Sequence, residues 1–273
     1  MVQGRFFKLS ILGLCYAFLY IPILYVVVFS FNSTTSLSSW SHFSLVWYEK
    51  LFSDVDLQKA LMNSLKASTV AATFSVILGC LCAFISTKKK KTFFLDALSA
   101  TPLVLPEVLL GLSFLIFFVM AESFFGIPEG RGLDTIVIAH TTVSLAYATL
   151  IIRARLLEID THLEEAALDL GARPVRVFFS ITLPFLKPAI LVAWFLSFTL
   201  SLDDLVVASF AAGPSSATLP ISIFSSLKTG ITPEINALCS LIVLLVFLIA
   251  PIASAWFYLS FRKRVEKKAH FMA

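Results

Sequence analysis

The chain has 273 residues, of which 58% are hydrophobic and only 14% are charged, and its mean hydropathy is +0.91. Soluble domains contain about 45–50% apolar and about 25% charged residues, so this composition excludes an ordinary soluble domain. The formal net charge is +4, and what it reports depends on where the basic residues lie.

Apolar residues are gathered into six long runs. A bilayer core of about 30 Å is crossed by roughly 20 apolar residues in a helix, so the runs predict an all-α polytopic membrane protein with six transmembrane helices. The ten-residue alternating segments of a transmembrane barrel are not seen in the sequence. The runs cover residues 9–31, 61–87, 93–120, 133–152, 186–207 and 235–261.

Three runs have features of their own. The first exceeds 20 residues and ends without a small-x-small motif, whereas the apolar region of a signal peptide has about 7–15 residues, so we expect an uncleaved span. The third carries Pro102, Pro106 and Gly111, which predicts a kink or a break. The fifth runs into Asp203 and Asp204 at its far end.

Basic residues are distributed asymmetrically around the runs. With the N-terminus in the cytoplasm, 16 of the 21 lysines and arginines lie on the cytoplasmic side, including the four-lysine segment 88–91. The positive-inside rule therefore predicts that both termini are cytoplasmic. The net charge accordingly reflects membrane topology rather than nucleic-acid binding.

Cysteine and histidine give no sign of a metal site. The four cysteines lie inside apolar runs, where a free thiol behaves as a small hydrophobic side chain. Cys80 and Cys82 are spaced C-x-C, with no second pair to complete a site, and the four histidines form no H-E-x-x-H motif. We expect neither a metal nor a cofactor.

The segment 153–185, between the fourth and fifth runs, has the pattern of an ordered cytoplasmic element. Thr161 and Glu164 predict a capping box at the start of a short helix over 162–170. Gly171 is placed to end that helix in the left-handed conformation, and Pro174 to open a second helix.

After these two helices, Pro184 and Pro188 are expected to break the chain before the fifth run. The pattern leaves two interpretations open for the whole segment. It is either a connection packed against its own bundle or a docking element for a soluble partner.

A family resemblance bears on this choice. Glu165-Ala166-Ala167, then Gly171, then Ile181-Thr182-Leu183-Pro184 resemble the E-A-A…G…I-x-L-P signature of binding-protein-dependent ABC transporter permeases. The resemblance implies an ABC type I importer permease fold with a coupling helix seated in a cleft of an ATPase subunit. It assigns that contact to Glu165, Ala166, Ala167 and Gly171, with Ile181 and Pro184 completing the signature.

The resemblance extends from about residue 20 to 238. The chain is most similar to the second, C- or I-type permease of spermidine/putrescine importers. It implies a bacterial inner-membrane subunit forming a single permease domain over 1–273. The implied partners are a homologous permease, two cytoplasmic ATPase subunits and a periplasmic binding protein. The segments that carry it are Tyr20-Ile21-Pro22, Phe31-Asn32-Ser33, Trp47-Tyr48, residues 198–204, Gly213-Pro214-Ser215, Thr218-Leu219-Pro220 and residues 233–237.

No energy-coupling chemistry is encoded in the chain itself. The sequence has no G-x-x-x-x-G-K-[ST] motif to hold nucleotide phosphates and no evident Ser/His/Asp arrangement. We therefore expect a transport subunit rather than an enzyme, with ATP hydrolysis in a separate polypeptide. An ion-coupled secondary transporter is the alternative, although such proteins often contain two discontinuous helices and only one broken run is visible. A membrane-embedded enzyme is the least favoured reading.

Three acidic residues lie within or at the ends of apolar runs. An intramembrane carboxylate costs about 2.5–3.5 kcal/mol to insert and usually faces a cavity. We assign Glu107, Asp203 and Asp204 to a substrate pathway on this ground. Adjacent residues point about 100° apart on a helix, so one aspartate is expected to face the pathway and the other to cap a helix or bind a neighbour.

The predicted outer side carries five basic and nine acidic residues, which would concentrate cations there. The positive-inside rule accounts equally well for the general asymmetry. Trp47 and Tyr48 either stack on a cation or belong to an interfacial aromatic belt, and Glu234 is assigned to the same outer pathway. The prediction is a permease subunit that imports polyamines from periplasm to cytoplasm, with putrescine, spermidine and other small cations or organic solutes left open.

Overall fold

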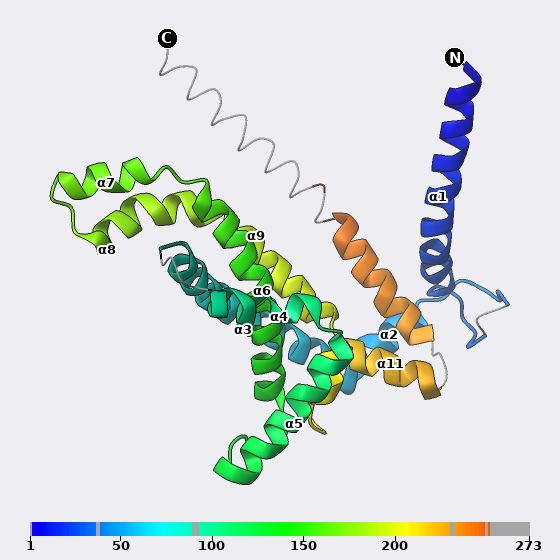
Figure 1. The fold of residues 1–273 in the computed structure, drawn as a ribbon. Coiled ribbons are helices and arrows are strands. Elements are labelled where there is room, and N and C mark those ends of the chain that lie inside the picture. The colour runs from blue at the N-terminus through cyan, green and yellow to red at the C-terminus, as the bar shows by residue number, and fades with distance from the viewer. Residues whose placement is uncertain (1, 37–38, 89–92, 230–232, 249–250, 252–273) are drawn as a thin grey trace. The chain divides into compact units, whose positions relative to one another are not determined.

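The computed structural model describes residues 2–36, 39–88, 93–229, 233–248 and 251. Within these residues the chain is almost entirely helical and has no β-strand, with a single antiparallel bridge joining Asn32 and Phe43. The all-α prediction is thereby confirmed. The helices are α1 (Val2–Phe29), α2 (Val46–Ser53), α3 (Val55–Lys88), α4 (Phe93–Val104), α5 (Glu107–Phe125), α6 (Leu133–Leu157), α7 (Thr161–Asp169), α8 (Pro174–Val177), the π-helix η1 (Phe178–Thr182), α9 (Leu183–Asp203), α10 (Val206–Ala211) and α11 (Leu219–Thr229), followed by Pro233–Leu248 (Figure 1).

Five helical segments are long and apolar enough to cross a membrane: Lys8–Phe29, Val55–Thr87, Glu107–Phe125, Leu133–Leu157 and Pro174–Asp203. The sixth predicted run corresponds to the shorter apolar helix Pro233–Leu248, and its remainder lies largely outside the described residues, as does the segment 89–92 with most of the lysine run. The count of six spans therefore stays a prediction.

The third run is broken as expected. It forms α4 and α5, which are separated at Leu105 and Pro106. Pro102 lies inside α4 and Gly111 inside α5, so of the three residues singled out only Pro106 marks the break.

The expected break at Pro184 and Pro188 is wrong. The chain is helical without interruption from Pro174 to Asp203, with Pro184 in the first turn of α9 and Pro188 inside that helix. The π-helix Phe178–Thr182 precedes Pro184, and its wider turn relieves the clash between a proline ring and the carbonyl four residues earlier. Membrane helices tolerate proline because neighbouring groups satisfy the freed backbone.

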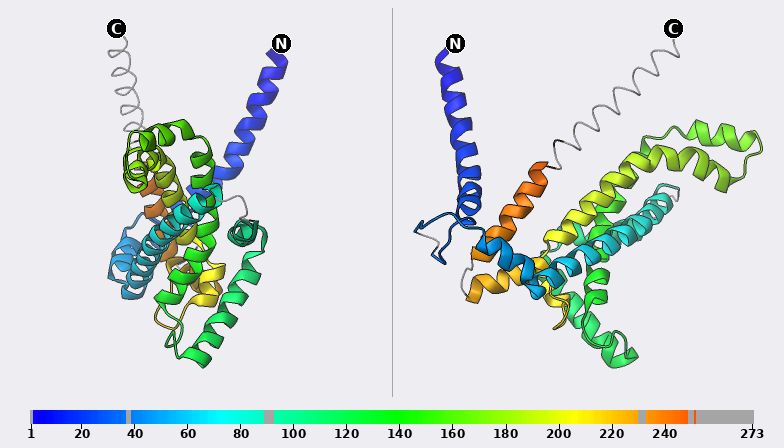
Figure 2. Two further views of the ribbon diagram at one scale, coloured as in Figure 1. Left: turned by 60° about the vertical axis from the view of Figure 1, so that its left-hand side comes forward. Right: turned by 180° about the vertical axis from the view of Figure 1, so that it is seen from behind.

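The chain divides into two compact units, Met1–Val55 with Ser226–Ala273, and Asp56–Ser225. In the second unit, α6 packs along α9 and also contacts α4, α5 and α10; Figures 1 and 2 show α6 and α9 side by side. Small residues are part of this contact: Ala148 of α6 and Ala193 of α9 are fully buried in one apolar cluster. Helices in lipid associate through such small-residue contacts because apolar burial provides no driving force there.

In the first unit, a polar cluster orders the segment after α1. The buried Asn32 side chain donates to Thr34 Oγ1, Ser36 O and Ser39 O, and its Oδ1 accepts from the Ser41 amide. The Trp47 indole of α2 donates to Asn32 O at 2.6 Å, which ties α2 to this segment.

Candidate substrate cavity and coupling site

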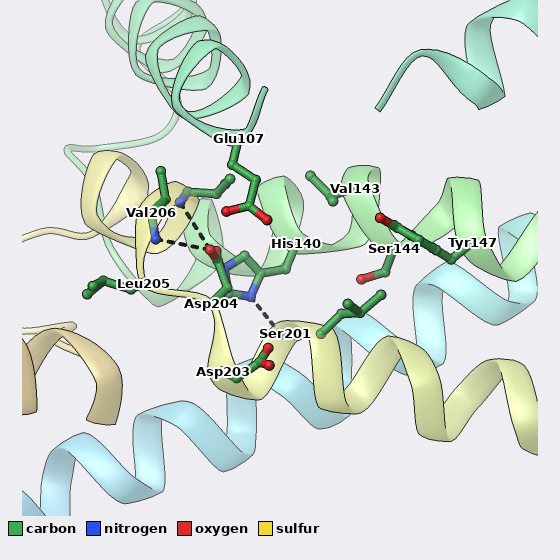
Figure 3. Close-up of a pocket in the computed structure, with 12 residues that line it drawn as sticks. Glu107, His140, Val143, Ser144, Tyr147, Ser201, Asp203, Asp204, Leu205 and Val206 are labelled. Atoms are coloured by element: carbon green, nitrogen blue, oxygen red, sulfur yellow. Dashed lines mark hydrogen bonds and ion pairs between the residues drawn. The ribbon is translucent and has the colours of Figure 1, made fainter. Parts of the chain in front are cut away.

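A cavity of about 280 Å³ opens in the second unit between the start of α5, one face of α6, the end of α9 and the start of α10 (Figure 3). Its lining contains three carboxylates, one histidine and no lysine or arginine. The lining residues are Glu107, His140, Val143, Ser144, Tyr147, Leu200, Ser201, Asp203, Asp204, Leu205, Val206 and Val207.

Two helix breaks meet at this cavity. One lies just before α5, at Leu105 and Pro106, and the other just after α9, at Asp204 and Leu205. Only the first break was expected from the sequence. The fifth run was expected to extend through Val207, which is wrong because Val207 belongs to α10. The pair Asp203-Asp204 at the end of an apolar run was the available signal for the second break.

Asp204 is engaged by the protein itself. Its Oδ1 accepts from the amides of Val206 (3.1 Å) and Val207 (3.2 Å), and its Oδ2 accepts from that of Ala208 (3.0 Å). These are amides of the first turn of α10, which have no partner within the helix. The expectation that one aspartate of the pair satisfies a helix end is confirmed for Asp204, but both aspartates line the cavity, so the expectation that only one of them faces it is wrong.

His140 is the residue that the sequence analysis missed. It is 3% exposed, its Nε2 lies 2.8 Å from Asp204 Oδ2, and its Nδ1 lies 2.6 Å from Ser201 Oγ. One imidazole thus joins α6 to the end of α9 and to the start of α10. The only sequence signal was a histidine in the middle of an apolar run.

Glu107 and Asp203 are the less engaged carboxylates. Both are exposed, and among the described residues neither has a lysine or arginine partner. Glu107 is the first residue of α5, where the helix dipole favours a negative charge. Two such carboxylates beside the partly engaged Asp204 give the cavity a negative potential suited to a cationic ligand.

Trp47, Tyr48 and Glu234 belong to the first unit. Trp47 is 5% exposed, and the Lys50 ammonium lies 4.6 Å from the centre of its ring. The Tyr48 hydroxyl lies 2.8 Å from Ser30 Oγ, and Glu234 lies 4.0 Å from the Lys50 ammonium. These contacts order the first unit, and a role of the three residues in the pathway stays a prediction.

The predicted two-helix element is present between α6 and α9. Gly171 has φ +83° just after α7, and Pro174 begins α8, so both assignments are confirmed. The capping box is wrong, because α7 begins at Thr161 itself and the carboxylate of Asp160 accepts from the His162 amide at 3.0 Å. Glu164 instead accepts a hydrogen bond from the buried Thr182 hydroxyl at 2.5 Å, which ties α7 to η1.

The outer surface of α7 is open. No residue of this helix is buried, Ala166 is exposed, and Glu165 pairs with His162 at 3.4 Å across the surface. Leu163 and Leu168 are 45% and 43% exposed, and Leu170, just beyond the helix, is 90% exposed. Ile181 lies in η1, and the exposed Pro184 lies in the first turn of α9. Among the described residues, no group of three or more His, Cys, Asp or Glu side chains is arranged to hold a metal ion.

A bundle of long apolar helices, with an acidic cavity at two helix breaks and an exposed helical hairpin, defines a multi-pass membrane permease. The chain belongs to the family described as binding-protein-dependent transport system inner membrane component, whose model matches residues 75–267. It is therefore an inner-membrane protein.

Curated relatives match nearly the full chain. It is 43% identical to the putrescine transport system permease protein PotI of Escherichia coli (strain K12), over 96% of this chain and 92% of the relative. It is 39% identical to the spermidine/putrescine transport system permease protein PotC of Haemophilus influenzae, over 89% of this chain and 93% of the relative.

Solved structures share the fold. A chain of a bacterial ABC transporter involved in the import of the acidic polysaccharide alginate superposes with a TM-score of 0.71 at 15% identity, covering 93% of this chain and 96% of that one. A chain of the MetNI methionine ABC transporter in an inward-facing conformation gives a TM-score of 0.58 at 19% identity, covering 73% and 92%. The ABC importer permease fold expected from the coupling motif is confirmed.

Proposed function

We propose that this chain is a transmembrane subunit of an ATP-driven importer that carries putrescine or spermidine from the periplasm to the cytoplasm. The main support for this proposal is the cavity at the two helix breaks. Glu107, Asp203 and Asp204 line this cavity, and its lining contains no lysine or arginine. Such a site suits a small organic polycation. The names of the relatives, putrescine and spermidine/putrescine permeases, point to the same cargo class.

The proposed assembly contains a homologous permease, two cytoplasmic ATPase subunits and a periplasmic binding protein, with this chain as one permease domain. A structural neighbour has been solved in complex with an alginate pentasaccharide-bound periplasmic protein. The open surface of α7, with Glu165 and Ala166 exposed and Ala167 partly exposed, supports docking of a soluble partner rather than a connection packed on its own bundle. Membership of the permease family favours ATP as the energy source over an ion gradient.

In the proposed cycle, closure of the ATPases pushes on α7, and Gly171 allows the sharp turn that links α7 to α8. The push reaches α9 through α8 and η1, which are continuous with it. Because the cavity lies at the far end of α9, a shift of this helix changes the positions of Asp203 and Asp204 relative to Glu107. The bundle then alternates between inward- and outward-facing states.

The first test is uptake of radiolabelled putrescine and spermidine into cells that express the chain with its neighbouring genes. Glu165→Lys reverses the charge on α7, and we expect uptake to fall at least tenfold while the protein remains in the membrane. Asp169→Lys, at the end of the same helix and outside the signature, is the matched control. Full uptake by Glu165→Lys would remove the coupling role from Glu165, and wild-type uptake of neither polyamine would redirect the search to other cations or solutes.

The cavity is tested by Glu107→Gln and Asp203→Asn, which remove one charge each at nearly constant volume. We expect each to reduce the maximal uptake rate at least tenfold because one charged contact to the cation is lost. Glu129→Gln removes an exposed carboxylate between α5 and α6, outside the cavity, and should transport normally. Normal transport by both cavity variants would rule out this cavity as the pathway.

A further inference from the structure

Tyr147 lines the same cavity as the acidic residues but at a different level along α6. His140, Val143, Ser144 and Tyr147 are all lining residues and are spaced at i, i+3, i+4 and i+7, so they share one face of the helix. Seven residues correspond to about 10 Å of helix rise. The cavity is therefore extended along α6, with His140 and Asp204 at one level and Tyr147 at the other.

Figure 3 shows this separation of the two ends. Glu107, Asp203 and Asp204 gather around His140, while Tyr147 lies on the far side of Val143 and Ser144. Val143 and Leu200 add apolar surface to the lining. An acidic end, an aromatic end and an apolar wall are the features that would bind a flexible chain with a charge at each terminus.

The chemistry of Tyr147 fits the second terminus. It is the only aromatic residue in the lining, and the face of a tyrosine ring attracts ammonium groups. The side chain is half-buried, yet among the described residues no hydrogen bond to its hydroxyl is formed. The hydroxyl is therefore available to a ligand.

We propose that Tyr147 is a specificity-determining residue that receives the second ammonium group of an extended diamine, while the first lies between Glu107 and Asp203. An extended four-carbon diamine is about 6 Å between its nitrogens. A hydrogen bond of about 2.8 Å to a carboxylate at one end and a contact of up to about 6 Å with the centre of the tyrosine ring at the other extend its reach to about 12–15 Å. This reach covers the rise of about 10 Å between the two levels of α6. The inference rests on the proposed function and adds to it a selection by chain length.

The test measures maximal transport rates of the full importer in proteoliposomes with saturating binding protein. Diamines of three to six carbons and the monoamine butylamine are compared. Saturation removes the preference of the binding protein from the comparison, so the ratio of rates between cargoes reports on the membrane cavity. We expect Tyr147→Leu to lower the four-carbon rate about tenfold and to leave the butylamine rate within twofold of wild type.

Two further variants sharpen the result. Tyr147→Phe keeps the ring and should retain the order of preference, whereas Tyr147→Trp reduces the space at this end and should shift the fastest cargo to a shorter diamine. Tyr16→Leu, at an exposed tyrosine of α1, is the matched control and should leave all ratios unchanged. If Tyr147→Leu does not reach the membrane, the shift expected of Tyr147→Trp decides the question.

The outcomes separate the two proposals. If the wild-type importer moves diamines, and Tyr147→Leu and Tyr147→Trp leave the ratios of transport rates between diamines of different length unchanged, the role of Tyr147 alone is overturned. A uniform fall for all cargoes, butylamine included, assigns Tyr147 a structural role and also overturns it. A wild-type importer that moves no diamine overturns the proposed function, and this inference with it.

Discussion

At the scale of single residues, the neighbours Asp203 and Asp204 make different contacts although they are chemically identical. The helix ends between them: Asp203 is the last residue of α9, and the Asp204 backbone is extended, with φ −68° and ψ 123°. This change of direction brings the Asp204 carboxylate to three amides of α10 and to His140. The Asp203 carboxylate has no lysine or arginine partner in the part of the chain that the structure describes.

The first prediction follows from this division. Asp204→Asn loses a charged acceptor shared by backbone amides and His140, and we expect it to destabilise the protein by about 2 kcal/mol. Asp203→Asn should stay within about 0.5 kcal/mol of wild type, because it breaks no intramolecular bond of this kind, although it impairs transport. Thermal unfolding of the purified importer measures both, and equal stability of the two variants would contradict the assignment.

His140 is expected to act through the hydrogen bond of its Nδ1 with Ser201 and the 2.8 Å contact of its Nε2 with Asp204. His140→Leu leaves the buried Ser201 hydroxyl and one Asp204 contact unpaired, and should cost about 2 kcal/mol of stability. His140→Gln offers an amide N–H and a carbonyl in their place and should recover at least half of the loss. An unfolding midpoint of His140→Leu equal to that of wild type would show that the bridge contributes nothing.

At the scale of elements, the short helix α10 is held between α5 and α6. Asp204 and His140 fix its start, and the Phe210 ring packs onto Gly111 of α5, where an added Cβ would overlap the ring. Thr135 Oγ1 of α6 also donates to Ala211 O at 2.7 Å, which fixes the end of α10. The cavity walls thus depend on a helix of only six residues.

Gly111→Ala should separate α5 from α10 and cost about 1–3 kcal/mol through overpacking. Phe210→Ala creates space at the same contact. The double variant should therefore lose less stability than the sum of the losses in the two single variants. The unfolding free energies of wild type, both single variants and the double variant form a cycle that measures this coupling. Additive effects would show that the two residues do not meet.

The contact between α7 and η1 gives a second prediction at this scale. Thr182→Val removes the hydroxyl that donates to Glu164, which loosens α7 from η1 while preserving side-chain shape. We expect the ratio of polyamine transported to ATP hydrolysed to fall several-fold in proteoliposomes. Thr161→Val, at the exposed first residue of α7, is the control and should keep the ratio. An unchanged ratio in Thr182→Val would show that the bond does not transmit movement.

At the scale of the whole molecule, the distribution of lysine and arginine predicts that both termini and the α7–α8 hairpin face the cytoplasm. Glu129 and Asp169 are exposed residues on opposite predicted sides. In a background whose four cysteines are replaced, Glu129→Cys should react with a membrane-impermeant thiol reagent in intact cells, and Asp169→Cys only after permeabilisation. The reverse pattern would invert the topology.

Much of the fold could be predicted because the bilayer imposes a local rule. Every backbone amide and carbonyl in the hydrocarbon core must be paired, so an apolar run of sufficient length becomes a helix whatever its neighbours are. The break at Pro106, the left-handed Gly171 and the start of α8 at Pro174 are equally local consequences of proline and glycine geometry. Family membership was recognisable from the spacing of a few residues, which is also a local feature of the sequence.

The cavity could be identified only from the tertiary structure. His140 lies 61 residues from Ser201 and 64 from Asp204, and the η1 turn before Pro184, the α10 break and the burial of Trp47 all depend on packing between distant segments. The sequence alone determined that the long apolar runs are largely helical, where proline separates α4 from α5, and which residues form the predicted coupling motif. Only the tertiary structure decided which polar groups are paired with one another and which face the cavity, because the partner of a buried polar group is set by which helices pack together.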